Sequence, residues 1–301
     1  SDAVIPFSLF DDRGFTVIDG EVVETRETAT SAKMGALLLD KIRSLRMDKV
    51  LELWLTPLRE PITLSSSAGS LTRMTRGLSI RIGDLDDAFH HRRLPWYLDL
   101  GGSQPHQVIA GAPRSGRTTL LQTLVVSGAL THEPERLAFL LADCASGKLA
   151  EVAESPNVAA YARPGDEETL SRVLGEARRL IALRREEMVS RRISSVDGYL
   201  DSKATAPVPG DPYGYVIVAI DGIGGFYGED PDARLERSRL LRPIIDQGAS
   251  VGVHLIYTAD SMESGTSGNL PHHSVKLSAG IQLPTGDTTS LTRISPELRV
   301  R

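Results

Sequence analysis

The chain has 301 residues, of which 41% are hydrophobic and 24% are charged, and its formal net charge is −5. No run of about 18 apolar residues occurs, which excludes a membrane-spanning helix within the printed sequence. The acidic balance disfavours DNA as a partner, because nucleic-acid binders use basic faces to neutralise phosphates. The single cysteine, Cys144, excludes an intrachain disulfide, favours a reducing compartment and is expected to be a small buried hydrophobe.

The first part of the chain predicts a small α+β segment. Two short β patterns between residues 15 and 23 flank Asp19-Gly20, which is a strong signal for a hairpin. Apolar residues then recur at helical spacing over residues 30–47, and residues 50–55 form a further β pattern.

A loop rich in serine and glycine at residues 65–70 marks the expected boundary between two parts of the chain. We expect residues 1–65 to be a linker segment or the tail of a preceding module. Residues 66–301 are then the main domain.

The main domain alternates between strand and helix patterns. We expect strands at 79–82, 95–100, 107–110, 136–142, 213–220 and 252–258, and helices at 118–130, 166–192 and 233–247, the last kinked at Pro243. This order predicts an α/β fold with a mainly parallel central sheet flanked by helices. In the helix at 166–192, Arg184 interrupts the apolar stripe, so we expect the last turns of that helix to lie near the surface.

A glycine-rich octet lies between an apolar strand and a helix. Its residues are Gly111, Ala112, Pro113, Arg114, Ser115, Gly116, Arg117 and Thr118, and Thr119 follows. With one substitution the octet fits the Walker A pattern G-x-x-x-x-G-K-[ST]. The glycines let consecutive N–H groups surround phosphate oxygens, and the helix presents its N-terminus to the same anion. We therefore expect residues 111–119 to bind the phosphates of ATP, with the Thr118 hydroxyl on Mg²⁺.

Arg117 stands where the Walker A pattern has lysine. Lysine is a compact charge that reaches the β- and γ-phosphates, whereas a guanidinium group is larger, planar and forked. We expect anion binding to survive this change and the alignment of a transition state to be lost.

An apolar strand pattern ends in Asp221, which is the form of a Walker B strand. Such an aspartate holds the Mg²⁺ together with the loop hydroxyl, so we expect Thr118 and Asp221 to share the metal. The next position is Gly222, where active ATPases of this kind carry a glutamate that orients the attacking water. Glu229 and Asp230 follow several residues later and would have to swing back to replace it.

Several segments in a fixed order carry a family resemblance. They are WLTPL at 54–58, GDLDD at 83–87, LDL at 98–100, AGAPRSGRTTLL at 110–121, LAD at 141–143, GKL at 147–149 and GASVGVHL at 248–255. In this order the chain resembles the FtsK/SpoIIIE-type ATPases, and within them the EccC ATPases of type VII secretion. The resemblance spans about residues 50–260 and implies a RecA/FtsK-like P-loop NTPase fold of the additional-strand type.

The departures from that family are informative. Ala249 stands where the family has an arginine, so this position offers no arginine finger to a neighbour. Asp260 replaces a glutamine that would sense the γ-phosphate after the last strand. Together with Arg117 and Gly222, four catalytic parts differ, which predicts a degenerate ATPase with weak or no hydrolysis.

The resemblance also implies cofactors and partners. ATP and Mg²⁺ are the expected cofactors, and neighbouring ATPase modules of the same chain or of a hexameric ring are expected partners. A C-terminal module of this family binds the signal tail of exported EsxB-like WXG-type substrates. The resemblance therefore implies substrate recognition in the cytoplasmic part of a secretion complex, which reaches the membrane through other parts of the protein.

Two other functions stay open. A DNA-translocating motor of the same family would need a basic channel and a working Walker pair, and both the net charge and Arg117 count against it. A nucleotide-free assembly subunit would have no physical need for both Thr118 and Asp221.

The remaining polar candidates have structural interpretations. The adjacent histidines at 90–91 and at 272–273 point in different directions, which disfavours a shared metal. His254 is expected to be a core residue. Residues 262–301 show no clear element.

Overall fold

The computed structural model describes residues 14–18, 21–25, 34–44, 63–64, 71, 73–102, 105–260 and 279–282. The chain divides into two compact units, residues 1–56 and 57–301. Several expectations lie outside the described residues: the strand at 50–55, the WLTPL motif, the boundary loop at 65–70 and the histidines at 272–273.

The first unit contains a hairpin and a helix. Strands β1 (Gly14–Ile18) and β2 (Glu21–Thr25) pair antiparallel, with Val17 opposite Val22. The hairpin predicted around Asp19-Gly20 is therefore confirmed. Helix α1 (Met34–Ser44) lies within the stretch predicted to be helical.

The core of the second unit is a six-stranded sheet in the order β10-β5-β9-β8-β6-β7. Its strands are β5 (Gln107–Ala110), β6 (Leu137–Asp143), β7 (Val158–Ala162), β8 (Tyr215–Asp221), β9 (Val253–Ala259) and β10 (Ala279–Gln282). All five neighbouring pairs are parallel. Every residue of β5, β6, β8 and β9 is buried, as expected for strands covered on both faces.

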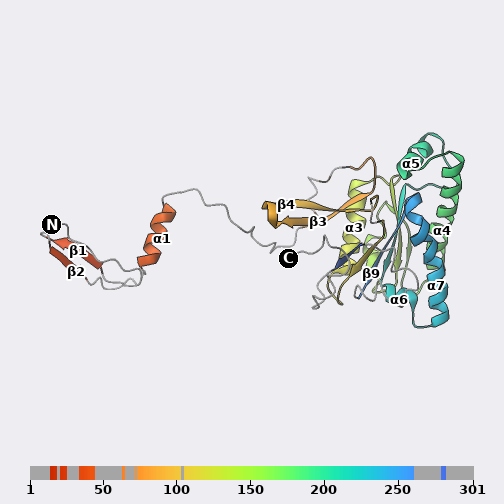
Figure 1. The fold of residues 1–301 in the computed structure, drawn as a ribbon. Helices are drawn as coiled ribbons and strands as arrows, with labels where there is room; N and C mark the ends of the chain where they lie inside the picture. The colour runs from red at the N-terminus through yellow and green to blue at the C-terminus, as the bar shows by residue number, and fades with distance from the viewer. Residues whose placement is uncertain are drawn as a thin grey trace. The chain divides into compact units, whose positions relative to one another are not determined.

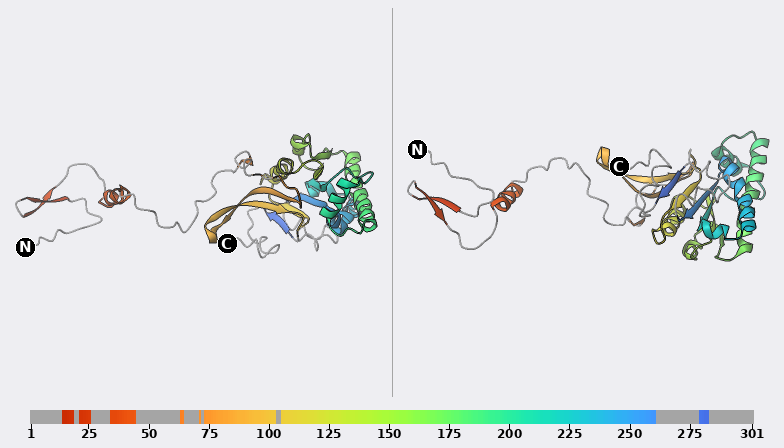
Figure 2. Two further views of the ribbon diagram at one scale, coloured as in Figure 1. Left: turned by 90° about the horizontal axis from the view of Figure 1, so that it is seen from above. Right: turned by 60° about the horizontal axis from the view of Figure 1, so that its bottom comes forward.

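Helices cover both faces of this sheet. They are α3 (Arg117–Thr131), α4 (Glu167–Ser190), α5 (Val196–Thr205), α6 (Ile223–Tyr227) and α7 (Pro231–Pro243). Figure 1 shows α3 on one face and α4 with α7 on the other, and the two further views keep α4 and α7 side by side (Figure 2). The predicted α/β fold is confirmed. In the part of the chain that the structure describes, no helix has the length and apolar character needed to span a bilayer.

A separate antiparallel pair precedes the sheet. Strands β3 (Ser79–Asp87) and β4 (Arg92–Asp99) form it, and β3 packs against α3. Both strands were expected. Trp96 of β4 is half-buried and packs against the core.

Several elements escaped the sequence patterns, among them β7, α5 and β10. Strand β7 has the sequence VAAYA, whose small residues give little β signal, and α5 has the sequence VDGYLDSKAT, with few apolar positions. The expectation of no element in the tail was wrong, because β10 pairs in parallel with β5 at the edge of the sheet.

The expectation that Arg184 brings the end of α4 to the surface was also wrong. Its side chain is fully buried and donates from Nε and Nη2 to both carboxylate oxygens of Asp211, at 2.8 and 2.9 Å. The same guanidinium donates to the carbonyls of Val251, Tyr213 and Gly214. A buried charge is tolerated at this position because it is paired with a carboxylate and each of its three nitrogens has an acceptor.

The predicted helix at 233–247 changes type at Pro243. Helix α7 ends there, and the chain continues as a π-helical turn at 244–248 and a 3₁₀ turn at 249–251 before β9 begins. A proline has no N–H to donate to the preceding turn, which explains the position of the change.

Candidate functional site

The glycine-rich octet forms the loop that joins β5 to α3, at the carboxyl edge of the sheet. Gly111 N donates to the Ala259 carbonyl at 3.1 Å, which ties the start of the loop to the end of β9, and Ser115 N closes a turn onto Ala112 O at 3.1 Å. Arg114 has a φ of +66°, a left-handed conformation that is rare for residues other than glycine. Residues held in such conformations cluster at ligand sites.

The N-terminus of α3 opens toward this loop without a side-chain cap. Gly116 is the N-cap residue, with a φ of +98°, and Leu120 N makes the first helical bond to Gly116 O at 2.8 Å. The amides of residues 117–119 precede that bond, so an anion is a natural partner for them. The buried Oγ of Ser115 also lacks a hydrogen-bond partner among the described residues. Such a cradle fits a phosphate group.

The two residues expected to share a metal lie side by side. Thr118 Oγ1 donates to Asp221 Oδ2 at 2.8 Å, although 103 positions separate them in the sequence. The Asp221 side chain is buried at the carboxyl end of β8. Hydroxyl and carboxylate oxygens are suitable ligands for Mg²⁺, so these two side chains fit the metal of a bound nucleotide.

Thr258 is a site residue that the sequence analysis missed. Its Oγ1 donates to Asp221 Oδ1 at 2.7 Å and accepts from Gly222 N at 2.7 Å. It therefore fixes the second carboxylate oxygen of Asp221 and the backbone that follows. The available signal was a polar residue at the carboxyl end of a buried strand, but only the strand order places β9 next to β8.

Two of the substituted positions are each other's partners. The Arg117 guanidinium forms an ion pair with the Asp260 carboxylate. The Arg117 side chain is 19% exposed and that of Asp260 is 75% exposed. The sequence analysis treated these residues as two separate departures, whereas the structure joins them.

The position expected for a catalytic glutamate is shaped for glycine. Gly222 has a φ of +82°, and a Cβ atom there would lie 2.9 Å from the Cβ of Ala145 and 3.2 Å from the carbonyl oxygen of Cys144. A glutamate would therefore strain the backbone and clash with the loop after β6. A Gly222→Glu change, which would put back the usual glutamate, therefore meets a steric obstacle.

Asp230 has a structural role, and Ala249, which stands at the arginine position, lies at the other edge of the sheet. Asp230 is the N-cap of α7 and accepts from Asp232 N at 3.2 Å and Ala233 N at 3.4 Å, so its carboxylate has a structural role. Ala249 precedes the amino end of β9, at the edge of the sheet opposite to the loop.

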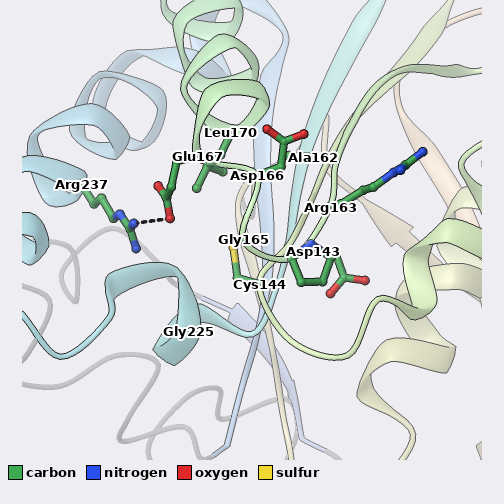
Figure 3. Close-up of a pocket in the computed structure, with 11 residues that line it drawn as sticks. Asp143, Cys144, Ala162, Arg163, Gly165, Asp166, Glu167, Leu170, Gly225 and Arg237 are labelled. Atoms are coloured by element: carbon green, nitrogen blue, oxygen red, sulfur yellow. Dashed lines mark hydrogen bonds and ion pairs between the residues drawn. The ribbon is translucent and has the colours of Figure 1, made fainter.

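A separate cavity of about 210 Å³ lies beyond the ends of β6 and β7 (Figure 3). Three of its charged groups are already engaged, since Arg237 binds Glu167 at 2.7 Å and Asp166 caps α4 through Thr169 N at 2.9 Å. Cys144 also lines it, and burial raises the pKa of this thiol to about 12, so the thiol stays neutral and packs as a small apolar group.

Two of the histidines that the structure describes, His254 and His90, have structural contacts. His254 is buried, and its Nδ1 lies 2.9 Å from the Pro105 carbonyl. His90 is exposed and pairs with Asp87 at 2.8 Å. Among the described residues, no group of three or more histidine, cysteine or acidic side chains has the arrangement of a metal site.

The strand order and the loop together define a class of protein. The strand β9 lies between the strand that precedes the phosphate loop, β5, and the strand that ends in the Walker B aspartate, β8. This inserted strand is the mark of an additional-strand P-loop NTPase.

The chain belongs to the FtsK/SpoIIIE family, which matches residues 84–266. It is 31% identical over 259 residues to the ESX-5 secretion system protein EccC5 of Mycobacterium marinum, covering 80% of this chain and 18% of that protein. It is 32% identical over 207 residues to the ESX-1 secretion system protein EccCb1 of Mycobacterium tuberculosis, covering 68% of this chain and 34% of that protein. The chain thus spans about a fifth to a third of the length of these relatives.

Solved structures of type VII secretion ATPases are also similar to this chain. The cytoplasmic domain of the Thermomonospora curvata type VII secretion ATPase EccC matches with a TM-score of 0.71 and 25% identity, over 91% of this chain and 33% of that chain. ATPases 2 and 3 of the same EccC, in complex with a signal sequence peptide, match with a TM-score of 0.67 and 27% identity, over 78% of this chain and 43% of that chain.

Proposed function

We propose that this chain is a nucleotide-binding module of a type VII secretion ATPase, with weak or no hydrolysis. Residues 111–119 hold the phosphates of an adenine nucleotide, and Thr118 with Asp221 holds its Mg²⁺. The observation that carries the proposal is the hydrogen bond of 2.8 Å between these two side chains beside an uncapped helix N-terminus. The bound Mg²⁺ would neutralise phosphate charge, while the loop orients the phosphates.

Calorimetry with Mg²⁺-nucleotide tests the binding. Thr118→Val keeps the shape of the side chain and removes its hydroxyl, so it should weaken Mg²⁺-dependent binding by at least about tenfold. Thr118→Ser keeps the hydroxyl and serves as the matched control. If no adenine nucleotide binds the unaltered chain at millimolar concentration, or if nucleotide does not raise its melting temperature, the nucleotide-free alternative is correct.

Weak hydrolysis follows from two features of the site. Gly222 offers no carboxylate to orient water, and its backbone shape does not suit one. Arg117 is engaged by Asp260 and is not a lysine. Steady turnover near or above about 1 s⁻¹, the lower end of the ordinary enzyme range, would contradict the proposal.

The secretion role rests on the relatives. Their names place EccC proteins in ESX secretion systems, and one EccC structure holds a signal sequence peptide. We infer that this chain is a C-terminal module, residues 66–301 preceded by a linker or the tail of another module, in the cytoplasmic part of a membrane-anchored complex. Its partners are neighbouring ATPase modules and the signal tail of an EsxB-like exported substrate.

Fluorescence anisotropy tests the recognition step. A labelled copy of the signal sequence peptide from the Thermomonospora curvata complex should bind the chain saturably, and a scrambled peptide of the same composition should not. Equal binding of both peptides, or of neither, would remove this peptide class from the proposal and leave nucleotide binding unaffected.

A further inference from the structure

Arg117 is the residue at the cation position of the phosphate loop, and it is paired with Asp260. The residue at this loop position normally reaches the oxygens of the β- and γ-phosphates. In this chain its guanidinium already holds a carboxylate, and it is only 19% exposed. The carboxylate is therefore an anion bound where the loop cation would meet the last phosphate of a triphosphate.

Asp260 cannot move far from this place. It directly follows Ala259, whose carbonyl accepts from Gly111 N at 3.1 Å, and Ala259 pairs with Ala110 across the parallel strands. The backbone that carries the carboxylate is thus fixed to the start of the loop. Its side chain is 75% exposed, so it has room to rotate but stays within reach of the site.

The net charge of the ion pair affects how strongly a γ-phosphate can bind. A lone cation would offer one positive charge to a γ-phosphate, whereas Arg117 and Asp260 together offer none. A γ-phosphate must either displace the carboxylate or bind beside it, and both cost free energy through repulsion between like charges. The β-phosphate has other partners, the amides of residues 117–119, which the ion pair leaves open.

We infer that this site prefers a nucleoside diphosphate to a triphosphate, with the Asp260 carboxylate standing in for the γ-phosphate on Arg117. The inference rests on the proposed nucleotide binding and names the phosphate length that the site selects. Thr118 and Asp221 take part with either nucleotide, because their hydrogen bond does not involve the ion pair.

Calorimetric titrations of the full 301-residue chain with Mg²⁺-ADP and with a non-hydrolysable Mg²⁺-ATP analogue test the inference. The unaltered chain should bind ADP at least about tenfold more tightly than the analogue. Asp260→Asn, which keeps the shape and removes the charge, should tighten binding of the analogue by about tenfold and change that of ADP by less than about twofold. The matched control is Glu168→Gln, which removes one negative charge from the exposed Glu168–Arg172 pair and should change neither affinity.

The outcomes separate the inference from the proposed function. If the analogue binds as tightly as ADP, or if Asp260→Asn leaves the preference unchanged, the inference is overturned while nucleotide binding stands. If Asp260→Asn weakens both nucleotides, the carboxylate supports the loop instead of excluding a phosphate, and the inference is again overturned. If neither nucleotide binds the unaltered chain, the proposed function itself fails.

Discussion

Two arginine–carboxylate pairs lie at opposite edges of the same sheet. At the amino edge, Arg184 and Asp211 are both completely buried, and the guanidinium also binds carbonyls next to the amino ends of β8 and β9. At the carboxyl edge, the side chains of Arg117 and Asp260 are 19% and 75% exposed. The chemical groups are the same, and burial is the main difference between them.

The difference in burial gives the two pairs different roles. A buried pair has exchanged water for fixed partners, so removing one member leaves a charge without compensation. A pair open to water contributes little to the stability of the fold, because both charges stay hydrated when the pair is broken. The pair at the amino edge therefore stabilises the fold, whereas the carboxyl edge keeps the backbone amides of the loop accessible to a ligand.

Breaking the buried Arg184–Asp211 pair should have the largest effect on the free energy of unfolding. Arg184→Ala should lower the free energy of unfolding by about 3–5 kcal/mol, because Asp211 would remain buried without its main partner. Asp260→Asn at the other edge should cost less than about 1 kcal/mol. Urea unfolding of both variants measures the contrast, and equal losses would show that burial does not distinguish the two pairs.

Gly222, which follows the Walker B strand, tests whether the backbone at the carboxyl edge is strained. Gly222→Ala should cost about 1–3 kcal/mol, since its φ of +82° and the contact of 2.9 Å both oppose a Cβ atom. The matched control is Gly224→Ala in α6, where a Cβ atom meets nothing within 4 Å. Chemical denaturation measures both variants. An equal effect at the two positions would contradict the assigned strain.

The backbone geometry at Gly222 also predicts the effect of substitutions on ATPase activity. The double variant Arg117→Lys with Gly222→Glu should not gain ATPase activity over Arg117→Lys alone, because the glutamate distorts the turn it would need. A phosphate-release assay on both variants measures this. A clear gain in the double variant would mean that the backbone at residue 222 adapts to a side chain.

Thr258 is hydrogen-bonded to both the Asp221 carboxylate and the Gly222 amide at the carboxyl edge. Thr258→Val should cost about 1–3 kcal/mol, because the amide of Gly222 and one oxygen of Asp221 would lose a buried partner. It should also weaken Mg²⁺-nucleotide binding by releasing the Asp221 carboxylate. Thr123→Val, which removes a hydroxyl bonded only to its own helix, is the control. Unfolding and calorimetric measurements that show no difference between the two variants would exclude this role for Thr258.

Local patterns predicted those parts of the molecule that depend on neighbours in sequence. The Asp19-Gly20 signal predicted the first hairpin, and the loop between an apolar strand and a helix predicted the turn from β5 into α3. The buried runs of β6 and β8 predicted a parallel sheet with both faces covered. That Thr118 and Asp221 lie together followed from the motif, whereas their sharing of a metal stays a prediction.

Contacts that depend on strand order could not be predicted. Thr258 reaches Asp221 only because β9 lies beside β8, and no local pattern records that order. Arg184 looked like a break in an apolar stripe because its partner, Asp211, lies in a loop 27 positions away. β10 was missed because an edge strand of four residues carries too little pattern of its own.

The smallest expected effect concerns pH and lies at the amino edge. Burial lowers the pKa of His254 from 6.5 to about 3, so the folded protein keeps this ring neutral. The unfolded chain takes up a proton near pH 6.5, so the contribution of His254 is full above that pH and declines as the pH falls toward 3. The decline is at most about 1.4 kcal/mol for each pH unit.

Urea unfolding at pH 7.5, 6.5 and 5.5 measures this slope. His254→Gln should flatten it, whatever the variant's stability at neutral pH. His132 is the internal comparison, because burial lowers its pKa as well and His132→Gln should flatten the slope by a separate amount. If His254→Gln left the slope unchanged, burial would not hold this ring neutral, and the buried character assigned to the amino edge would be contradicted at this residue.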